Sequence, residues 1–285
     1  MSSVRAFLRK LIGAEDPERV RQLEVENAAL RELSARTRAL AAECRADANA
    51  LLHRLAGQRE GLPPAHLQVR QVGSVWGEKF HTSGRAILDD LAKAFRDAGQ
   101  PLEAAERILD FGCGVGRVLW NFQTFPHRGE IWGSDIDAES IAWDNANLSH
   151  VGRFTCNPSL PPTQFPDDHF DAIYVISVFT HLPEDMQFAW LGELRRILKP
   201  GGILAASFHG EHYWKKGDPT VCAEVESSGF AYRTGQKTEG LPDFYMVAYH
   251  SAEYIRARWT EFFDIVELKP QFIHGVHDLA VLKKR

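Results

Sequence analysis

The chain has 285 residues, of which 44% are apolar and 25% charged, and its formal net charge is −5. This is ordinary globular composition, which excludes a wholly disordered chain, and the acidic balance argues against a nucleic-acid partner. No apolar run is long enough to span a bilayer, and the four cysteines form no CxxC pair, so we expect a cytoplasmic protein without an integral membrane contact, a disulfide scaffold or a zinc site.

Residues 1–60 are predicted to form a helical arm rather than a globular domain. Phe7 is the only aromatic residue before Trp76, so this part of the chain lacks side chains that carry much of a core's burial energy. Asp16-Pro17-Glu18 is typical of a helix start, and a seven-residue series follows at Leu23, Leu30, Thr37, Cys44 and Leu51. We expect a long amphipathic helix that either forms a coiled coil, and so a homo-oligomer, or packs along the rest of its own chain.

Residues 61–100 are predicted to be a linker followed by a leading helix. Gly61-Leu62-Pro63-Pro64 breaks the first helix. Thr82 or Ser83 can cap the next helix, which ends near Gly99. The apolar face of that helix is formed by Ile87, Leu88, Leu91 and Phe95.

Strands and helices alternate from residue 101 to residue 285. Strands are predicted at 107–111, 130–133, around Phe154, and at 170–176, 203–207, 265–268 and 278–282, with helices at 137–147, 183–198 and 251–263. This alternation is typical of the α/β class, in which a mostly parallel sheet is covered on both faces and binds ligands at the carboxyl ends of its strands. The stretch 208–249 interrupts the rhythm and is rich in aromatic residues, which favours a lid insertion over a disordered loop.

A glycine-rich turn follows the first predicted strand, with glycines at 112, 114 and 116. Glycine lets the backbone turn tightly and approach a ligand closely, and we expect the next helix to present its N-terminus to that ligand. Arg117 stands where the NAD fingerprint requires its third glycine, which disfavours an NAD oxidoreductase, and no Gly-Lys-Ser/Thr ending of a P-loop is present.

Two acids near this turn indicate what kind of ligand it binds. Asp110 directly precedes the turn and suits an ammonium or another cationic group rather than a pyrophosphate. Asp135, at the end of the second strand, can accept hydrogen bonds from two ribose hydroxyls, whereas Asp137 is better placed to cap the following helix. Together they indicate a nucleoside with a cationic tail, and S-adenosylmethionine is such a molecule.

The segments ILDFGCGVG, GSDID, FDAIYVISVFTHL and LKPGG, in this order and spacing, resemble the class I S-adenosylmethionine-dependent methyltransferases over about residues 76–285. The SVFTHL and HTSGR segments resemble a bacterial subgroup, some of whose members are associated with glycosyltransferases. The resemblance implies a Rossmann-like, doubly wound, mostly parallel seven-stranded sheet. It also implies methyl transfer to a small-molecule or sugar-containing acceptor, with O- or N-methylation expected.

The resemblance further implies which residues bind the cofactor. Gly112, Cys113 and Gly114 would lie along its methionine part, with Asp110 near the amino group, Asp135 at the ribose and Ile136 at the adenine. Asn157 stands where such enzymes often place an acid near the adenine amine. Ser177 is a further candidate, and Arg85 either pairs with the cofactor carboxylate or is a solvated helix residue.

Histidines near the strand ends are the candidate general bases. His181 follows the fourth strand and His209 the fifth, and both positions lie where acceptor and cofactor should meet. Each could instead hold a loop through a backbone hydrogen bond, and His250, His274 and His277 are predicted to be structural or solvated. The histidine spacing gives no metal site.

The sequence is also compatible with a function other than catalysis. A catalytically silent S-adenosylmethionine-binding or scaffold protein would use residues 1–60 for assembly. A nucleic-acid acceptor is disfavoured because SVFTHL stands where the NPPY signature of amino-methylating enzymes would be.

Overall fold

The computed structural model describes residues 18, 21–23, 25–34, 36–37, 61–233 and 240–285. The chain divides into two compact units, residues 1–55 and 56–285. In the first unit the described residues are helical, and Val25, Leu30 and Leu33 are exposed. Cys44 and Leu51 of the seven-residue series lie outside the described residues, so the coiled coil stays a prediction.

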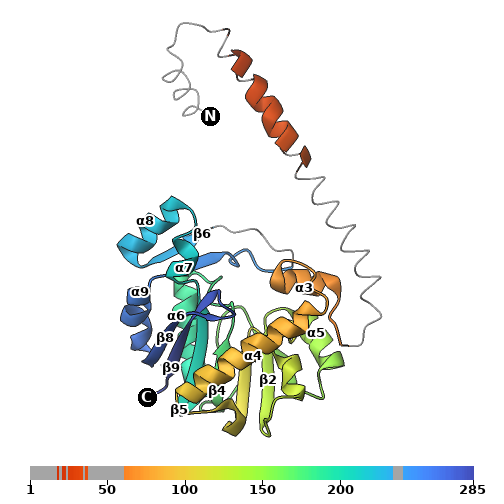
Figure 1. Cartoon of the computed structure of the whole chain (residues 1–285), viewed down its shortest axis with the longest axis vertical. Helices are drawn as coiled ribbons and strands as arrows, with labels where there is room; N and C mark the ends of the chain where they lie inside the picture. The colour runs from red at the N-terminus through yellow and green to blue at the C-terminus, as the bar shows by residue number, and fades with distance from the viewer. Residues whose placement is uncertain (1–17, 19–20, 24, 35, 38–60, 234–239) are drawn as a thin grey trace. The chain divides into compact units, whose positions relative to one another are not determined.

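The second unit holds nearly all the described elements (Figure 1). Its first half contains α3 (Ala65–Val72), α4 (Lys79–Asp97), the 3₁₀ helices η1 (Leu102–Ala104) and η2 (Leu119–Gln123), β1 (Arg107–Phe111), β2 (Glu130–Asp135), α5 (Ala138–Asn147), β3 (Arg153–Cys156) and β4 (Phe170–Val175). Its second half contains α6 (Glu184–Ile197), β5 (Leu198–Phe208), α7 (Glu211–Trp214), α8 (Pro219–Ser228), β6 (Phe230–Arg233), β7 (Val247–His250), α9 (Ala252–Arg258), η3 (Trp259–Glu261), β8 (Asp264–Ile273) and β9 (His277–Lys283).

Seven strands form one sheet in the order β3-β2-β1-β4-β5-β9-β8. The pairs from β3 to β5 are parallel, and β9 runs antiparallel to both β5 and β8. The predicted seven-stranded, mostly parallel sheet is therefore confirmed. The strand order reverses between β1 and β4, and in open α/β sheets such a reversal leaves a crevice at the carboxyl ends of the strands.

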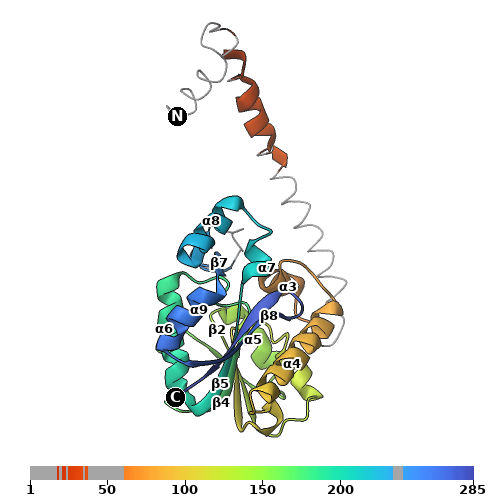
Figure 2. The same ribbon diagram turned by 60° about the vertical axis from the view of Figure 1, so that its left-hand side comes forward.

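Alternating side chains on the strands build two separate cores. In β1, Ile108 packs with α4 and η2 on one face, while Leu109 packs with α6 and α9 on the other. Figure 2 shows α4 on one side of the strands and α6 with α9 on the opposite side. None of the described helices is long and apolar enough to cross a bilayer.

Three local predictions are wrong. Residues 65–72, expected within a linker, form α3. The next helix begins at Lys79, earlier than predicted. Thr82 and Ser83 lie inside it and do not cap it, since their hydroxyls donate to the carbonyls of Lys79 and Phe80.

The third wrong prediction is the α-helix after the glycine turn. Gly116 has φ +64, which an α-helix does not accommodate, and the chain continues in turns until the 3₁₀ helix η2. By contrast, Asp137 caps α5 and Ser251 caps α9, as predicted, although α9 is shorter than expected and continues as η3.

Candidate functional site

A pocket of about 920 Å³, counted with its open mouth, lies over the carboxyl ends of β1, β2 and β4. The sequence-predicted residues that line it are Gly112, Gly114, Asp135, Ile136, Asn157 and Ser177. Further lining comes from Arg70, Gln71, Phe111, Arg117, Asp137, Ser140, Pro158, Ser159, Ile176, Val178, Leu182, Trp190, Leu241, Pro242, Phe244 and Tyr245. Most of this surface is apolar, with a few fixed polar groups, as is usual in small-molecule sites.

The floor of the pocket is the glycine turn. Gly112 and Cys113 both donate their backbone N–H to the carbonyl of Ser134, at 2.7 and 3.1 Å, which ties the turn to β2. Gly112 has φ +82, and a Cβ there would stand 2.2 Å from Cγ2 of Val178. Both the backbone conformation and the space therefore require glycine at this position.

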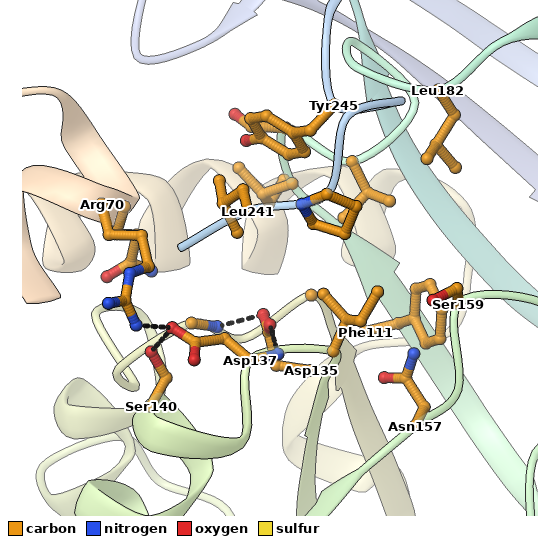
Figure 3. A pocket seen from close by; sticks show the side chains of 18 of the residues that line it. Arg70, Phe111, Asp135, Asp137, Ser140, Asn157, Ser159, Leu182, Leu241 and Tyr245 are labelled. Atoms are coloured by element: carbon orange, nitrogen blue, oxygen red, sulfur yellow. Dashed lines mark hydrogen bonds and ion pairs between the residues drawn. The ribbon is translucent and has the colours of Figure 1, made fainter. Parts of the chain in front are cut away.

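Asp135 connects the turn to α5. One carboxylate oxygen accepts the N–H of Gly114 at 2.7 Å, and the other accepts the N–H of Asp137 at 2.8 Å (Figure 3). Burial raises the pKa of Asp135, although these backbone donors oppose the shift. Each carboxylate oxygen has a second lone pair, so the group can still accept hydrogen bonds from hydroxyls of a ligand.

Three acidic or acid-bonded groups lie close to the turn without lining the pocket. Asp110 is buried beneath it, and burial, reinforced by the charge of Asp135, raises its pKa to about 8. The buried Cys113 points its sulfur at Asp144, with 3.8 Å between Sγ and Oδ2. Burial likewise raises the pKa of Asp144 to about 9. Both carboxyl groups are therefore mostly protonated at pH 7.

Asn157 and Ser177 reach the pocket with part of their hydrogen-bonding capacity already used. Asn157 accepts from the Ser134 hydroxyl at 2.7 Å and donates to the carbonyl of Pro158 at 2.9 Å. The N–H of Ser177 donates to the hydroxyl of Ser207 at 2.8 Å. Ser177 has φ +61, a strained conformation for a residue other than glycine, and such strain concentrates at functional sites.

Helix α3 supplies a wall that the sequence did not predict. Arg70 donates to Asp137 at 2.7 Å and to Glu139 at 3.0 Å, so α3 is tied to the start of α5. Gln71 donates to the carbonyl of Cys113 at 3.1 Å. Figure 3 shows Arg70 reaching from α3 to Asp137, with Leu241 and Tyr245 across the pocket. The amphipathic pattern of 65–72 was the available signal, but two prolines before it suggested a linker.

The candidate bases lie beside the pocket rather than on its lining. Nδ1 of His181 is 2.5 Å from the carbonyl of Met246, and the ring stacks on Tyr245 with centroids 4.0 Å apart. Nδ1 of His209 is 3.1 Å from the carbonyl of Ala248. Because a carbonyl can only accept, Nδ1 carries the proton in both rings and Nε2 keeps its lone pair.

Burial keeps these imidazoles neutral. It lowers the pKa of His181 and lowers the pKa of His209 to about 2. His277, which the sequence predicted to be structural or solvated, lies with its ring centroid 5.0 Å from that of His209, and burial lowers its pKa to about 4. Its Nδ1 is also 3.4 Å from the hydroxyl of Ser177, so it belongs to the group around the candidate bases.

Arg85 lies away from the pocket lining. On α4 it donates to Asp89 at 2.9 Å and to Thr124 at 3.3 Å. Arg117, which the sequence did not predict as a binding residue, lines the pocket instead. Within the described part of the chain, no group of three or more His, Cys, Asp or Glu side chains is arranged to hold a metal ion.

The pocket fits S-adenosylmethionine in the chemistry of its groups. Asp135 offers a carboxylate for ribose hydroxyls, and Ile136 with neighbouring apolar residues offers a surface for adenine. The buried acids Asp110 and Asp144 favour a ligand whose other end is positively charged, because a nearby cation offsets the cost of ionising them.

Part of this domain is similar to known methyltransferases. Residues 109–204 match the model of a methyltransferase domain. A probable methyltransferase, ltbC of Aspergillus luteorubrus, is 33% identical over 114 residues, which cover 36% of this chain and 40% of the relative. Cycloartenol-C-24-methyltransferase of Arabidopsis thaliana is 28% identical over 141 residues, which cover 46% of this chain and 41% of the relative. The chain thus spans less than half the length of these curated relatives.

Among solved structures, the PH0226 protein of Pyrococcus horikoshii OT3 aligns with a TM-score of 0.49 at 16% identity, covering 70% of this chain and 88% of that one. The family match runs from within β1 to within β5, and this part of the chain includes the glycine turn and Asp135. The match over residues 109–204 and the observed sheet support an S-adenosylmethionine-dependent methyltransferase domain with a Rossmann-like fold.

Proposed function

We propose that the protein transfers a methyl group from S-adenosylmethionine to an oxygen or nitrogen atom of a small-molecule or sugar-containing acceptor. The observation that carries this proposal is the position of a neutral imidazole, His181, against the wall of the cofactor pocket. Its tautomer is fixed by the carbonyl of Met246, so Nε2 is ready to accept a proton. An oxygen or nitrogen nucleophile needs such a proton acceptor when it attacks.

The cofactor supplies an activated methyl group on a sulfonium when it is bound, and the protein supplies alignment. Asp135 and the glycine turn would hold the nucleoside and methionine parts, and Leu241, Phe244 and Tyr245 would enclose the opposite side. Holding the reacting atoms in line can contribute roughly 7–11 kcal/mol in well-oriented systems. His181 would accept the acceptor's proton at Nε2, and His209 is the second candidate for this step.

A small-molecule acceptor agrees with the size of the cleft and with a relative named for cycloartenol. His181 stacks on Tyr245, which lines the pocket, and the neighbouring His209 stacks on Tyr213. Each pair combines an aromatic ring with a hydrogen-bond acceptor, the histidine Nε2. This combination suits an acceptor molecule with a hydroxyl-bearing ring. These features support the sugar-containing class.

The competing function is a silent cofactor-binding scaffold. The exposed Val25, Leu30 and Leu33 on the described part of the N-terminal helix support a role in assembly, which we propose as self-association of residues 1–60. Deleting 1–60 should leave cofactor binding intact and reduce the oligomeric mass. Identical stoichiometry of both forms in sedimentation would contradict self-association.

The activity is tested by incubating the full chain with methyl-labelled S-adenosylmethionine and a panel of hydroxylated and amino-bearing small molecules and glycosides. Release of S-adenosylhomocysteine with transfer of label to an oxygen or nitrogen supports the proposal. Cofactor binding without turnover on any acceptor would favour the scaffold, and label on carbon would contradict the expected acceptor atom.

A further inference from the structure

The guanidinium of Arg117 stands in the pocket without a hydrogen-bond or ion-pair partner among the described residues. The Nε of Arg117 is buried and makes no hydrogen bond, and the guanidinium carbon lies 5.8 Å from the ring centroid of Trp76. Arg70, the other arginine on the lining, is held by Asp137 and Glu139. The two arginines of this pocket therefore differ, because Arg70 has two ion-pair partners and Arg117 has none among the described residues.

An unpaired cation in a half-buried site is unfavourable, and burial accordingly lowers the pKa of Arg117. A bound anion would offset this cost. The guanidinium offers parallel N–H donors that match the two oxygens of a carboxylate, so a carboxylate is the ligand group it selects best.

Arg117 also lies next to the acids at the turn. Its charge acts on Asp110 strongly enough to oppose the raised pKa of that carboxyl. A buried acid beneath the turn and an arginine on the pocket lining are together complementary to a group that carries both charges. An α-amino acid, with its ammonium and its carboxylate on one carbon, is such a group.

We propose that Arg117 binds the α-carboxylate of the cofactor's methionine part, with the ammonium of the same part on the side of Asp110. This inference rests on the proposed function. Arg85 was the sequence-based candidate for binding this carboxylate, but Arg85 forms an ion pair with Asp89 on the surface of α4. The guanidinium of Arg117 also lies near His277, so an acid group on the acceptor is the competing source of the carboxylate.

The test compares two ligands that differ in this carboxylate alone, S-adenosylhomocysteine and its decarboxylated form, S-adenosyl-3-thiopropylamine. Calorimetry is carried out on the full chain and on Arg117→Gln. The natural chain should bind S-adenosylhomocysteine at least about 30-fold more tightly than the decarboxylated ligand, because truncating a buried charge pair has about this effect. In Arg117→Gln this preference should disappear through a loss of affinity for S-adenosylhomocysteine, with the decarboxylated ligand bound as before.

Arg153→Gln is the matched control, because Arg153 also stacks on a tryptophan, Trp132, at 5.1 Å but lies outside the pocket lining. It should keep the full preference. Arg117→Lys keeps the charge without the planar fork and should keep part of the preference, which separates a binding effect from misfolding of the glutamine variant.

Each outcome separates the inference from the proposed function. If the natural chain binds neither ligand, the cofactor assignment itself fails. If it binds both equally, or if Arg117→Gln retains the preference, the cofactor stands and Arg117 does not hold its carboxylate. If Arg117 instead binds an acid group of the methyl acceptor, Arg117→Gln should bind the cofactor with unchanged affinity and show a raised KM for acidic acceptors.

Discussion

Gly84, inside α4, is predicted to be a position where alanine destabilises the protein, although alanine favours helices. A Cβ added to Gly84 would stand 1.9 Å from the carbonyl oxygen of Arg117 and 2.7 Å from the carbonyl carbon. These are backbone atoms of the segment that follows the glycine turn, so they cannot move aside as the end of a side chain can. The helix therefore needs a bare Cα at this point to approach the turn.

The magnitude follows from two opposing effects. Replacing glycine by alanine in a helix interior usually stabilises by about 0.8–1 kcal/mol. Overpacking a tight contact costs about 1–3 kcal/mol, and the upper end applies here because the obstacle is backbone. We expect Gly84→Ala to lower the free energy of unfolding by about 2 kcal/mol in urea denaturation, and to weaken cofactor binding because the segment carrying Arg117 is displaced.

Gly192 in α6 is the matched control. The nearest atom to a Cβ there is Cε1 of Phe262 at 3.8 Å, an ordinary contact. Gly192→Ala should therefore stabilise the protein by up to about 1 kcal/mol without changing cofactor affinity. If both variants change stability by the same amount and in the same direction, the close approach at Gly84 does not determine the fold.

Three further predictions concern the site and its surroundings. Asp135→Asn should reduce the affinity for S-adenosylhomocysteine by about 10- to 100-fold in calorimetry, because an amide nitrogen cannot accept from Gly114 or Asp137, and an unchanged affinity would contradict its role. His181→Gln should lower kcat by about 10²- to 10⁴-fold with cofactor affinity unchanged, whereas undiminished turnover would remove His181 as the base. His250 is fully buried, and burial lowers its pKa to about 3. Below its ordinary pKa of about 6.5, the unfolded chain therefore binds a proton at His250 that the folded chain does not, and the protein loses stability as the pH falls. Between pH 6.5 and 5 the natural chain should lose about 1.6 kcal/mol of unfolding free energy more than His250→Gln, and an equal pH dependence of the two proteins in urea denaturation would contradict this.

Much of the fold could be predicted from the sequence because its signals are local. The buried runs 107–111 and 170–176, and the cap at Asp137, depend on neighbouring residues alone, and the structure places β1, β4 and α5 there. Gly112 and Asp135 were identifiable for the same reason, since a turn and a strand end are defined within a few residues.

The rest of the site depends on contacts between segments that are distant in sequence. Arg70 lines the pocket because Asp137, 67 residues further on, fixes its side chain. Arg117 has no ion-pair partner among the described residues, whereas Arg85 pairs with Asp89 on the surface. Neighbouring residues in the sequence predict neither outcome, since each depends on which acid the fold brings near. Sequence patterns therefore predicted the scaffold and the turn, while the selection of charged residues for the pocket needed the tertiary structure.

The buried acids at the turn have a consequence for how cofactor binding responds to pH. With its pKa raised to about 8, Asp110 is mostly protonated in the ligand-free protein at pH 7. An ammonium bound beside it would favour the carboxylate and return the pKa toward the ordinary range of aspartate. Binding would then release a proton, and affinity would rise with pH up to about 8.

This proton release is measurable by calorimetry of S-adenosylhomocysteine binding at pH 7 in buffers that differ in ionisation enthalpy. The natural chain should release close to one proton, roughly 0.9 from a group titrating one unit above the working pH. Asp110→Asn should abolish most of the release, because an amide cannot ionise. Binding without proton release in the natural chain would show that the ammonium does not lie beside Asp110. Of the two residues proposed to recognise the amino-acid part of the cofactor, only Arg117 would then remain.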